Sequence, residues 1–178
     1  MPDALVALAE RLQGVCLGRR VTVALAESCT GGLIAAAITA VPGSSGYFLG
    51  GVVSYANHAK ESLLGVPGGT LRAHGAVSAQ VAKAMAEGAM ARFGASLGAS
   101  VTGVAGPDGG TAAKPVGLVY LGIATADGTE VRRLQFGGDR QAIRQGAASA
   151  VLQWLIERAE GAPPAGSGAA ASAEASLA

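Results

Sequence analysis

The sequence predicts a single layered α/β/α domain built around a mixed β-sheet. Segments with helical spacing of apolar residues alternate with short apolar runs typical of buried strands, which is the pattern of layered α/β folds. The last two strand-like runs are joined by Asp127-Gly128, a hairpin turn sequence, so part of the sheet is expected to be antiparallel. The chain has 178 residues, of which 50% are hydrophobic and 14% charged, so it can bury one sizeable core.

The helices follow from apolar spacing and from capping side chains. Expected helices cover residues 3–17, 32–40, 57–64, 78–92 and 139 to about 160. The second of these is rich in helix formers. Asn57, Ser78 and Asp139 stand where a helix begins, and such side chains accept hydrogen bonds from the first free N–H groups.

The strands are short apolar runs bounded by turn-forming residues. Expected strands cover residues 21–25, 48–55, 99–102, 116–125 and 130–136. Gly50 and Gly51 inside the second run indicate a bulge or the close approach of another part of the chain. Composition also predicts a turn at 42–46 and a loop at 65–69, both rich in glycine and containing proline.

A change in composition marks a domain boundary near residue 160. Residues 161–178 are almost entirely Ala, Gly, Ser and Pro with one charge, so this segment cannot bury a core. The domain is therefore expected to cover 1–160, followed by a disordered low-complexity tail at 161–178.

Bulk properties argue against several classes of protein. The net charge of +1 and the absence of a basic run argue against nucleic-acid binding. No window approaches 18 uninterrupted apolar residues, so no membrane partner is expected, and an N-terminus with Asp3 instead of a basic stretch is unlike a signal peptide. Cys16 and Cys29 lack metal-binding or redox spacing, which predicts no metal site and fits a reduced cytoplasmic setting.

Ser28 is the first candidate for chemistry. It follows an apolar strand and precedes Gly31 and Gly32, which open a helix, so a hydroxyl and free backbone N–H groups can converge there. The alternative is an ordinary helix-capping residue. A serine nucleophile needs a base, and neither His58, on a short helix, nor His74, expected in a loop, is a convincing one.

Lys60 is the better candidate for the base. A lysine base must be neutral, so it requires burial or a neighbouring cation that lowers its pKa, and serine–lysine pairs are an established variant of the catalytic triad. Tyr55, at the end of the strand that leads to Lys60, could orient the lysine or relay a proton. The alternatives are a solvated lysine and an aromatic side chain at the core edge.

Two further features could bind an anion. Residues 102–110, TGVAGPDGG, follow a strand and match no standard nucleotide-binding loop, but their N–H groups could form an oxyanion hole; a tight turn is the alternative. Arg140 and Arg144 lie one turn apart at the start of the last helix, where two like charges beside the positive helix end favour a bound phosphate. Asp139 could instead offset them. Ser44 and Ser45 could supply further donors.

Seven blocks, taken together, resemble the C-terminal domain of the competence-damage-inducible protein family, also known as nicotinamide-nucleotide amidohydrolase. They cover nearly everything from residue 21 to the last helix, in family order: AESCTGG (26–32), PGSSGYF (42–48), VSYANHAK (53–60), LRAHGAVS (71–78), TGVAGPDGG (102–110), KPVG (114–117) and GGDR (137–140). Many members carry a large N-terminal domain, so the resemblance is to the stand-alone form.

The resemblance implies deamidation of nicotinamide mononucleotide to nicotinate mononucleotide and ammonia, without a metal or redox cofactor, and a homo-oligomer. It implies Ser28 as nucleophile with Tyr55 and Lys60 as catalytic partners. The residues expected to bind substrate, through oxyanion or phosphate contacts, are Thr30, Gly31, Gly32, Ser45, Thr102, Gly103, Ala105, Gly106 and Arg140. Two other functions stay open: a non-catalytic nucleotide-binding module, and a serine amidase acting on another small amide.

Overall fold

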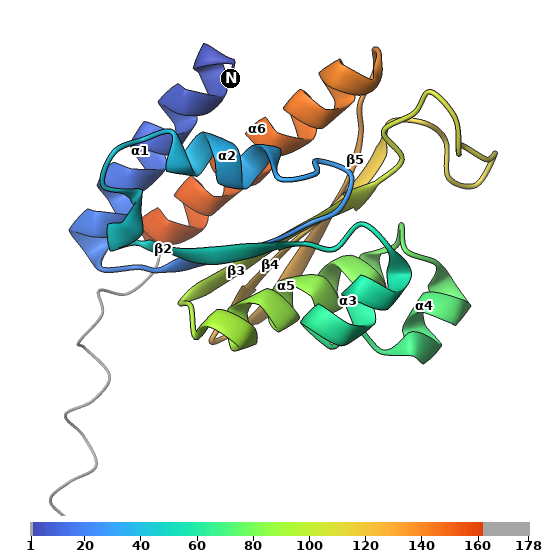
Figure 1. Ribbon diagram of the computed structural model, residues 1–178, viewed down its shortest axis with the longest axis horizontal. Helices are drawn as coiled ribbons and strands as arrows, with labels where there is room; N and C mark the ends of the chain where they lie inside the picture. The colour runs from blue at the N-terminus through green and yellow to red at the C-terminus, as the bar shows by residue number, and fades with distance from the viewer. Residues whose placement is uncertain (1, 162–178) are drawn as a thin grey trace, which may run out of the picture.

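One mixed sheet runs through the middle of the domain, with strand order β2-β1-β3-β4-β5 (Figure 1). The computed structural model describes residues 2–161. Its strands are β1 (Val23–Glu27), β2 (Phe48–Val53), β3 (Leu97–Gly103), β4 (Leu118–Thr125) and β5 (Gly128–Gln135). The first three are parallel to one another, and the pairings of β4 with β3 and with β5 are antiparallel. The segments that follow the three parallel strands therefore meet at one end of the sheet.

Helices cover both faces of this sheet, so the predicted layered α/β/α architecture is confirmed. One face carries α1 (Asp3–Arg19), α2 (Leu33–Thr39) and α6 (Arg140–Gly161), and the other carries α3 (Asn57–Leu64), α4 (Gly68–His74) and α5 (Ala79–Phe93) (Figure 1). A short 3₁₀ helix, η1 (Ser44–Gly46), precedes β2. Gly161 is the last residue of α6; the rest of the predicted tail lies outside the described residues.

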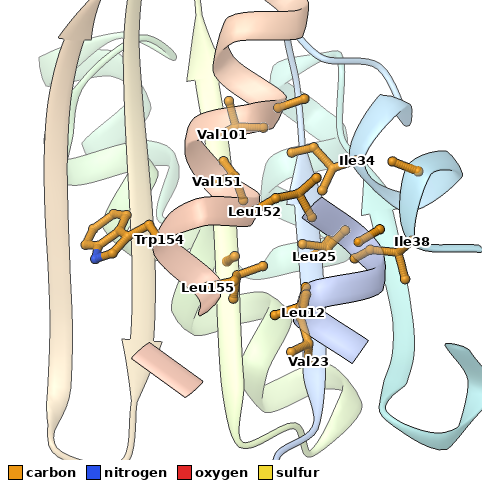
Figure 2. Packing of buried hydrophobic residues seen from close by; sticks show 14 of the residues in the cluster. Leu12, Val23, Leu25, Ile34, Ile38, Val101, Val151, Leu152, Trp154 and Leu155 are labelled. Atoms are coloured by element: carbon orange, nitrogen blue, oxygen red, sulfur yellow. The ribbon is translucent and has the colours of Figure 1, made fainter. Parts of the chain in front are cut away.

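The two faces of β1 have different side chains because successive residues of a strand point to opposite sides. Val23 and Leu25 join the larger core, where side chains of α1, α2 and α6 pack on the sheet (Figure 2). Ala24 and Ala26 face the smaller core beneath α5. The small residues let this helix approach closely; a Cβ at Gly98 of β3 would overlap the Ala86 carbonyl oxygen of α5.

Several local predictions are confirmed by the backbone. Ser78 caps α5, its hydroxyl accepting from the Val81 N–H at 3.3 Å, and Asp139 accepts from the Ala142 N–H at 2.8 Å. The pairing of β1 with β2 shifts register at Leu49, so a bulge precedes Gly50. Gly50 also has a φ of +147°, and a Cβ there would lie 2.5 Å from the Phe93 ring.

Other local predictions are wrong. Residue 57 does not cap α3; the capping position is Ala56, which makes no side-chain hydrogen bond. Part of the loop expected at 65–69, together with His74, belongs to α4, which the sequence pattern missed because Pro67, Gly68 and Gly69 are typical of loops. Burial of Leu71 in the smaller core holds this short helix. In residues 2–161 no helix has the length and apolar character needed to cross a membrane.

Candidate active site

Ser28 lies in the turn between β1 and α2, at the end of the sheet where the parallel strands stop. Its N–H donates to the Val101 carbonyl of β3 at 3.0 Å, and its own carbonyl accepts from the Gly31 N–H at 3.1 Å. Gly31 and Gly32 have φ values of +61° and +92°, a backbone conformation that residues with a side chain rarely adopt. The turn is therefore fixed on both sides of the serine.

Glu27 secures the other side of this turn, a role the sequence interpretation missed. Its buried carboxylate accepts from the N–H groups of Gly32 at 2.9 Å, Ile34 at 3.2 Å and Ala35 at 2.8 Å, so it caps α2. The sequence does carry an indication of this role, because a carboxylate at the end of a strand and a few residues before a helix can reach the positive end of that helix. Because neighbouring side chains alternate, Glu27 points to α2 while Ser28 lies on the side of α3.

Lys60 extends from α3 to Ser28 and is fully buried. Its Nζ lies 3.1 Å from Ser28 Oγ, 2.6 Å from the Ser54 carbonyl oxygen and 3.4 Å from the Tyr55 carbonyl oxygen. No carboxylate lies within 4.0 Å of this amine in the part of the chain that the structure describes. Burial lowers the pKa of Lys60 below the ordinary lysine value, which favours the neutral amine that a base requires.

The serine and the lysine open on a cavity of about 200 Å³. It is lined by Ser28, Cys29, Tyr55, Lys60, Ala76, Val77, Thr102, Gly103, Ala105 and Arg140. Burial raises the pKa of the Cys29 thiol to about 11, so this neighbour of Ser28 stays protonated at neutral pH. Neither His58 nor His74 is among the lining residues, and both are exposed.

The glycine-rich segment after β3 forms one wall of the cavity. Thr102 Oγ1 donates to the Ala76 carbonyl at 2.9 Å, so this hydrogen bond connects β3 to the lining segment that contains Ala76 and Val77. Gly103 packs so closely on β4 that a Cβ would lie 2.7 Å from the Leu118 carbonyl oxygen. Within residues 2–161, the N–H groups of Ala105 and Gly106 have no acceptor. Ala105 lines the cavity, so its N–H is a candidate oxyanion donor.

The turn at 28–32 offers fewer free donors than its glycines suggest. The N–H of Gly31 donates to Ser28 and that of Gly32 to Glu27. Thr30 differs: it is fully buried, and neither its N–H nor its Oγ1 has a partner in the described chain. Buried polar groups are nearly always satisfied, so Thr30 is an exception in this turn, but it is not among the residues that line the cavity.

Arg140 and Arg144 reach the site from the first turns of α6. Arg140 donates to the Gly106 carbonyl at 2.7 Å and to Tyr55 Oη at 3.1 Å, while Arg144 donates to the Thr30 carbonyl at 2.6 Å. All these acceptors are neutral, and neither guanidinium forms an ion pair within residues 2–161. Arg140 lines the cavity, and Arg144 lies beside it, so two cations without an ion pair stand at this end of the described domain.

Two predicted site residues, Tyr55 and Ser45, do not lie beside Ser28 and the Lys60 amine inside the cavity. The Tyr55 side chain is 62% exposed and lies at the mouth of the cavity, where it contacts Arg140 and not Lys60. Ser45 is in η1, before β2, whereas Ser28 follows the parallel strand β1. The two serines are therefore at opposite ends of the sheet, about 20 Å apart along a strand of this length. The structure does not bring Ser45 to the other predicted site residues of its own chain.

A larger hollow of about 470 Å³ lies at the end of the sheet remote from Ser28, near the β4–β5 turn. Arg20, Asp127, Glu157 and Arg158 contribute its charges, but it contains no pairing of a nucleophile with a buried base. The smaller cavity is the better candidate because it holds the perturbed lysine, the Ser28 hydroxyl and Arg140, which forms no ion pair within residues 2–161.

The comparisons with known proteins agree on one family. The model of the CinA C-terminal domain family matches residues 5–159. A CinA-like protein of Geobacter sulfurreducens is 58% identical over 137 residues, and one of Anaeromyxobacter dehalogenans is 52% identical over 156 residues. These alignments cover 77% and 87% of this chain but only 33% and 36% of the relatives.

Solved structures show the same similarity over nearly their whole length. The competence/damage inducible protein CihA of Agrobacterium tumefaciens has a TM-score of 0.85 at 42% identity, covering 88% of this chain and 96% of its own. A CinA superfamily protein of Klebsiella pneumoniae has a TM-score of 0.85 at 31% identity, covering 89% and 99% respectively. With the family model spanning almost all described residues, the chain belongs to the CinA C-terminal domain family.

Proposed function

We propose that this chain hydrolyses the carboxamide of nicotinamide mononucleotide, giving nicotinate mononucleotide and ammonia. The observation that carries the proposal is the fully buried Lys60 amine 3.1 Å from the Ser28 hydroxyl, in a cavity whose mouth holds Arg140. A serine beside a neutral amine base suits acyl transfer, and uncompensated arginines suit a phosphate.

The surroundings of Lys60 favour the protonation state that activates Ser28. A neutral amine has two N–H bonds and one lone pair. The carbonyls of Ser54 and Tyr55 can accept the two N–H bonds, at 2.6 and 3.4 Å, which leaves the lone pair directed at the Ser28 hydroxyl proton. The two carbonyls thereby position the base for proton transfer.

The reaction then proceeds in two halves. Ser28 Oγ bonds to the carboxamide carbon as its proton passes to Lys60, and the developing oxyanion is held by N–H groups such as that of Ala105. The C–N bond breaks, and ammonia leaves with the proton that Lys60 returns. Water, deprotonated by Lys60, next attacks the acyl-enzyme and releases the carboxylate, and Ser28 recovers its proton.

The charge pattern fits each part of this nucleotide. The cavity of about 200 Å³ accommodates the pyridinium ring and its amide, and a neutral Lys60 does not repel the ring's positive charge. The exposed Tyr55 ring at the mouth offers a π-face to the same cation. The phosphate extends toward Arg140, with Arg144 one turn further along α6.

An ammonia-release assay on nicotinamide mononucleotide tests the proposal directly. We expect ammonia and nicotinate mononucleotide in equal amounts from the wild-type chain and none from Ser28→Ala, whose fold is checked by circular dichroism. Nucleotide binding without ammonia would indicate a non-catalytic binding module. Release of ammonia from other small amides, but not from this nucleotide, would contradict the substrate and keep the amidase mechanism.

A further inference from the structure

Three residues with hydroxyl side chains stand side by side where the parallel strands end. The last residue of β1 pairs with Val53 of β2 and with Val101 of β3, and backbone hydrogen bonds from the Ser28 and Ser54 N–H groups continue both pairings by one residue. Ser28 therefore has Ser54 on one side and Thr102 on the other. Because side chains alternate along a strand, all three lie on the same face of the sheet, the one that α3 and α5 cover.

The hydroxyls on the two sides of Ser28 differ in their contacts. Thr102 Oγ1 donates to the Ala76 carbonyl at 2.9 Å. Ser54 is fully buried, and its Oγ has no hydrogen-bond partner within residues 2–161. Of the described residues with a buried, unpartnered side-chain oxygen, Ser54 is the one that also contacts Lys60, through its carbonyl. A buried hydroxyl without a partner is unfavourable in the resting protein, so this one requires an explanation.

Lys60 needs a further acceptor when it becomes charged. Uptake of the Ser28 proton turns a neutral amine with two N–H bonds into an ammonium with three. One N–H stays directed at the cavity, because it returns the proton to the leaving ammonia, and a second donates to the Ser54 carbonyl at 2.6 Å. The third has the Tyr55 carbonyl at 3.4 Å, which is longer than the roughly 2.7–3.2 Å of a good N–H···O bond. No carboxylate lies within 4.0 Å of the amine in the described chain.

We propose that Ser54 is a positioning residue whose hydroxyl accepts this third N–H while Lys60 is charged. The Ser54 carbonyl oxygen already lies 2.6 Å from the amine, so a rotation about the Cα–Cβ bond of the same residue brings Oγ toward it. Ser54 keeps its own proton throughout. The transferred proton passes from Ser28 Oγ to Lys60 Nζ and then to the leaving nitrogen. The inference rests on the proposed function, because it takes Lys60 as the base that activates Ser28.

Loss of the Ser54 hydroxyl should be visible in the ionisation of Lys60. Removing an acceptor of the charged form lowers the pKa of Lys60 further. Three other ionisable side chains line the same cavity: Cys29, Tyr55 and Arg140. The pKa of the Cys29 thiol, about 11, keeps it protonated at neutral pH. The ionisable side chains of α3 and of α5, which packs against it, are exposed apart from Lys60: His58, Glu61, Lys83, Glu87 and Arg92.

Variants of Ser54 separate the hydroxyl from the shape of the side chain. Ser54→Ala removes the hydroxyl, while Ser54→Thr and Ser54→Val share one shape and only the threonine keeps it. In the ammonia assay, we expect kcat to be about ten- to a hundredfold lower in Ser54→Ala than in wild type, and in Ser54→Val than in Ser54→Thr. KM should change little, because Ser54 is not among the residues that line the cavity. Equal kcat values in the threonine and valine variants would refute the proposal.

The pH profile of kcat gives a readout that a merely structural role would not move. Its midpoint should shift to lower pH in Ser54→Ala, whereas in Ser54→Thr it should stay near that of wild type. Ser100→Ala is the control, because it removes another buried hydroxyl from the same sheet, one that donates to the Ala82 carbonyl at 2.6 Å. This control should be less stable than wild type and keep its midpoint. An unmoved midpoint in Ser54→Ala would contradict the assigned role.

Urea unfolding tests the same role without turnover. Above the midpoint pH, Ser54→Ala loses no hydrogen bond, so it should be at least as stable as wild type. The fall in the free energy of unfolding that Lys60 causes as the pH drops should continue to lower pH in this variant, because its folded-state pKa is lower. If wild type releases no ammonia, the proposed function fails, while these unfolding curves still decide whether Ser54 supports the charged amine. The same pH dependence in both proteins would overturn the inference.

Discussion

Glu27 offers the sharpest test of how the turn that carries Ser28 is held. Its carboxylate accepts three N–H groups at the start of α2, at 2.8, 2.9 and 3.2 Å, and lies next to Ser28 in sequence. Glu27→Ala removes all three acceptors and the negative charge at the positive helix end. Glu27→Gln keeps the shape but has one acceptor oxygen, and its NH₂ group must face an N–H donor.

The size of the effect follows from these contacts. A buried donor that loses its partner costs about 1–3 kcal/mol, and loss of a side-chain cap at a helix start costs about 0.5–2 kcal/mol. The Ile34 N–H is buried, whereas Gly32 and Ala35 are half-buried and can partly turn to water. We therefore expect Glu27→Ala to lower the free energy of unfolding by about 2–5 kcal/mol and Glu27→Gln by about 1–3 kcal/mol.

Urea unfolding followed by circular dichroism measures both variants, with Glu10→Gln on the exposed side of α1 as control. In conditions where the variants stay folded, kcat should fall by as much as about a hundredfold, because small displacements of a nucleophile have effects of that size. KM should change less, since Arg140 and the far wall of the cavity are untouched. An unfolding midpoint for Glu27→Ala equal to that of wild type would refute the reasoning.

The other predictions concern individual site residues. Ser28→Ala should fold normally and lose about three or more orders of magnitude in kcat, whereas Cys29→Ala should stay active; the ammonia assay decides both, and an active Ser28→Ala would exclude the serine mechanism. The rate should rise with pH through the lowered pKa of Lys60, below the free-lysine value of about 10.4. Lys60→Arg, which cannot deprotonate, should be as inactive as Lys60→Ala, and an active Lys60→Arg would show that charge alone is needed. Lys60 should also make the free energy of unfolding fall as the pH drops from the unfolded-state pKa toward the lowered folded-state pKa, because the unfolded chain takes up the proton first. In Lys60→Met, the urea midpoint should not show this dependence on pH. Arg140→Ala should raise KM for nicotinamide mononucleotide about ten- to a hundredfold while barely changing activity on the riboside, and an equal loss on both substrates would assign Arg140 another role.

Most of the fold could be predicted from local pattern. The alternation of apolar runs and helical periodicity gave the five strands in their correct order along the chain, and turn residues gave the β4–β5 hairpin. Boundaries moved by a few residues because pairing with neighbouring strands extends a ladder beyond its most apolar part, as in β1, which ends at Glu27. The helix α4 was not predicted for a different reason. Burial of Leu71 in the smaller core outweighs the loop preference of Pro67, Gly68 and Gly69.

The sequence by itself determined which residue types were available for chemistry: a serine at a strand-to-helix turn, a lysine shortly after a tyrosine, and arginines at a helix start. Only the tertiary structure decided which of them meet. Parallel pairing of β1, β2 and β3 brings Ser28, the α3 lysine and the 102–106 segment to one end of the sheet, and α3 buries Lys60 completely. The same topology sends Ser45 to the other end. Burial, direction and proximity depend on contacts between residues distant in sequence, and no local pattern specifies them.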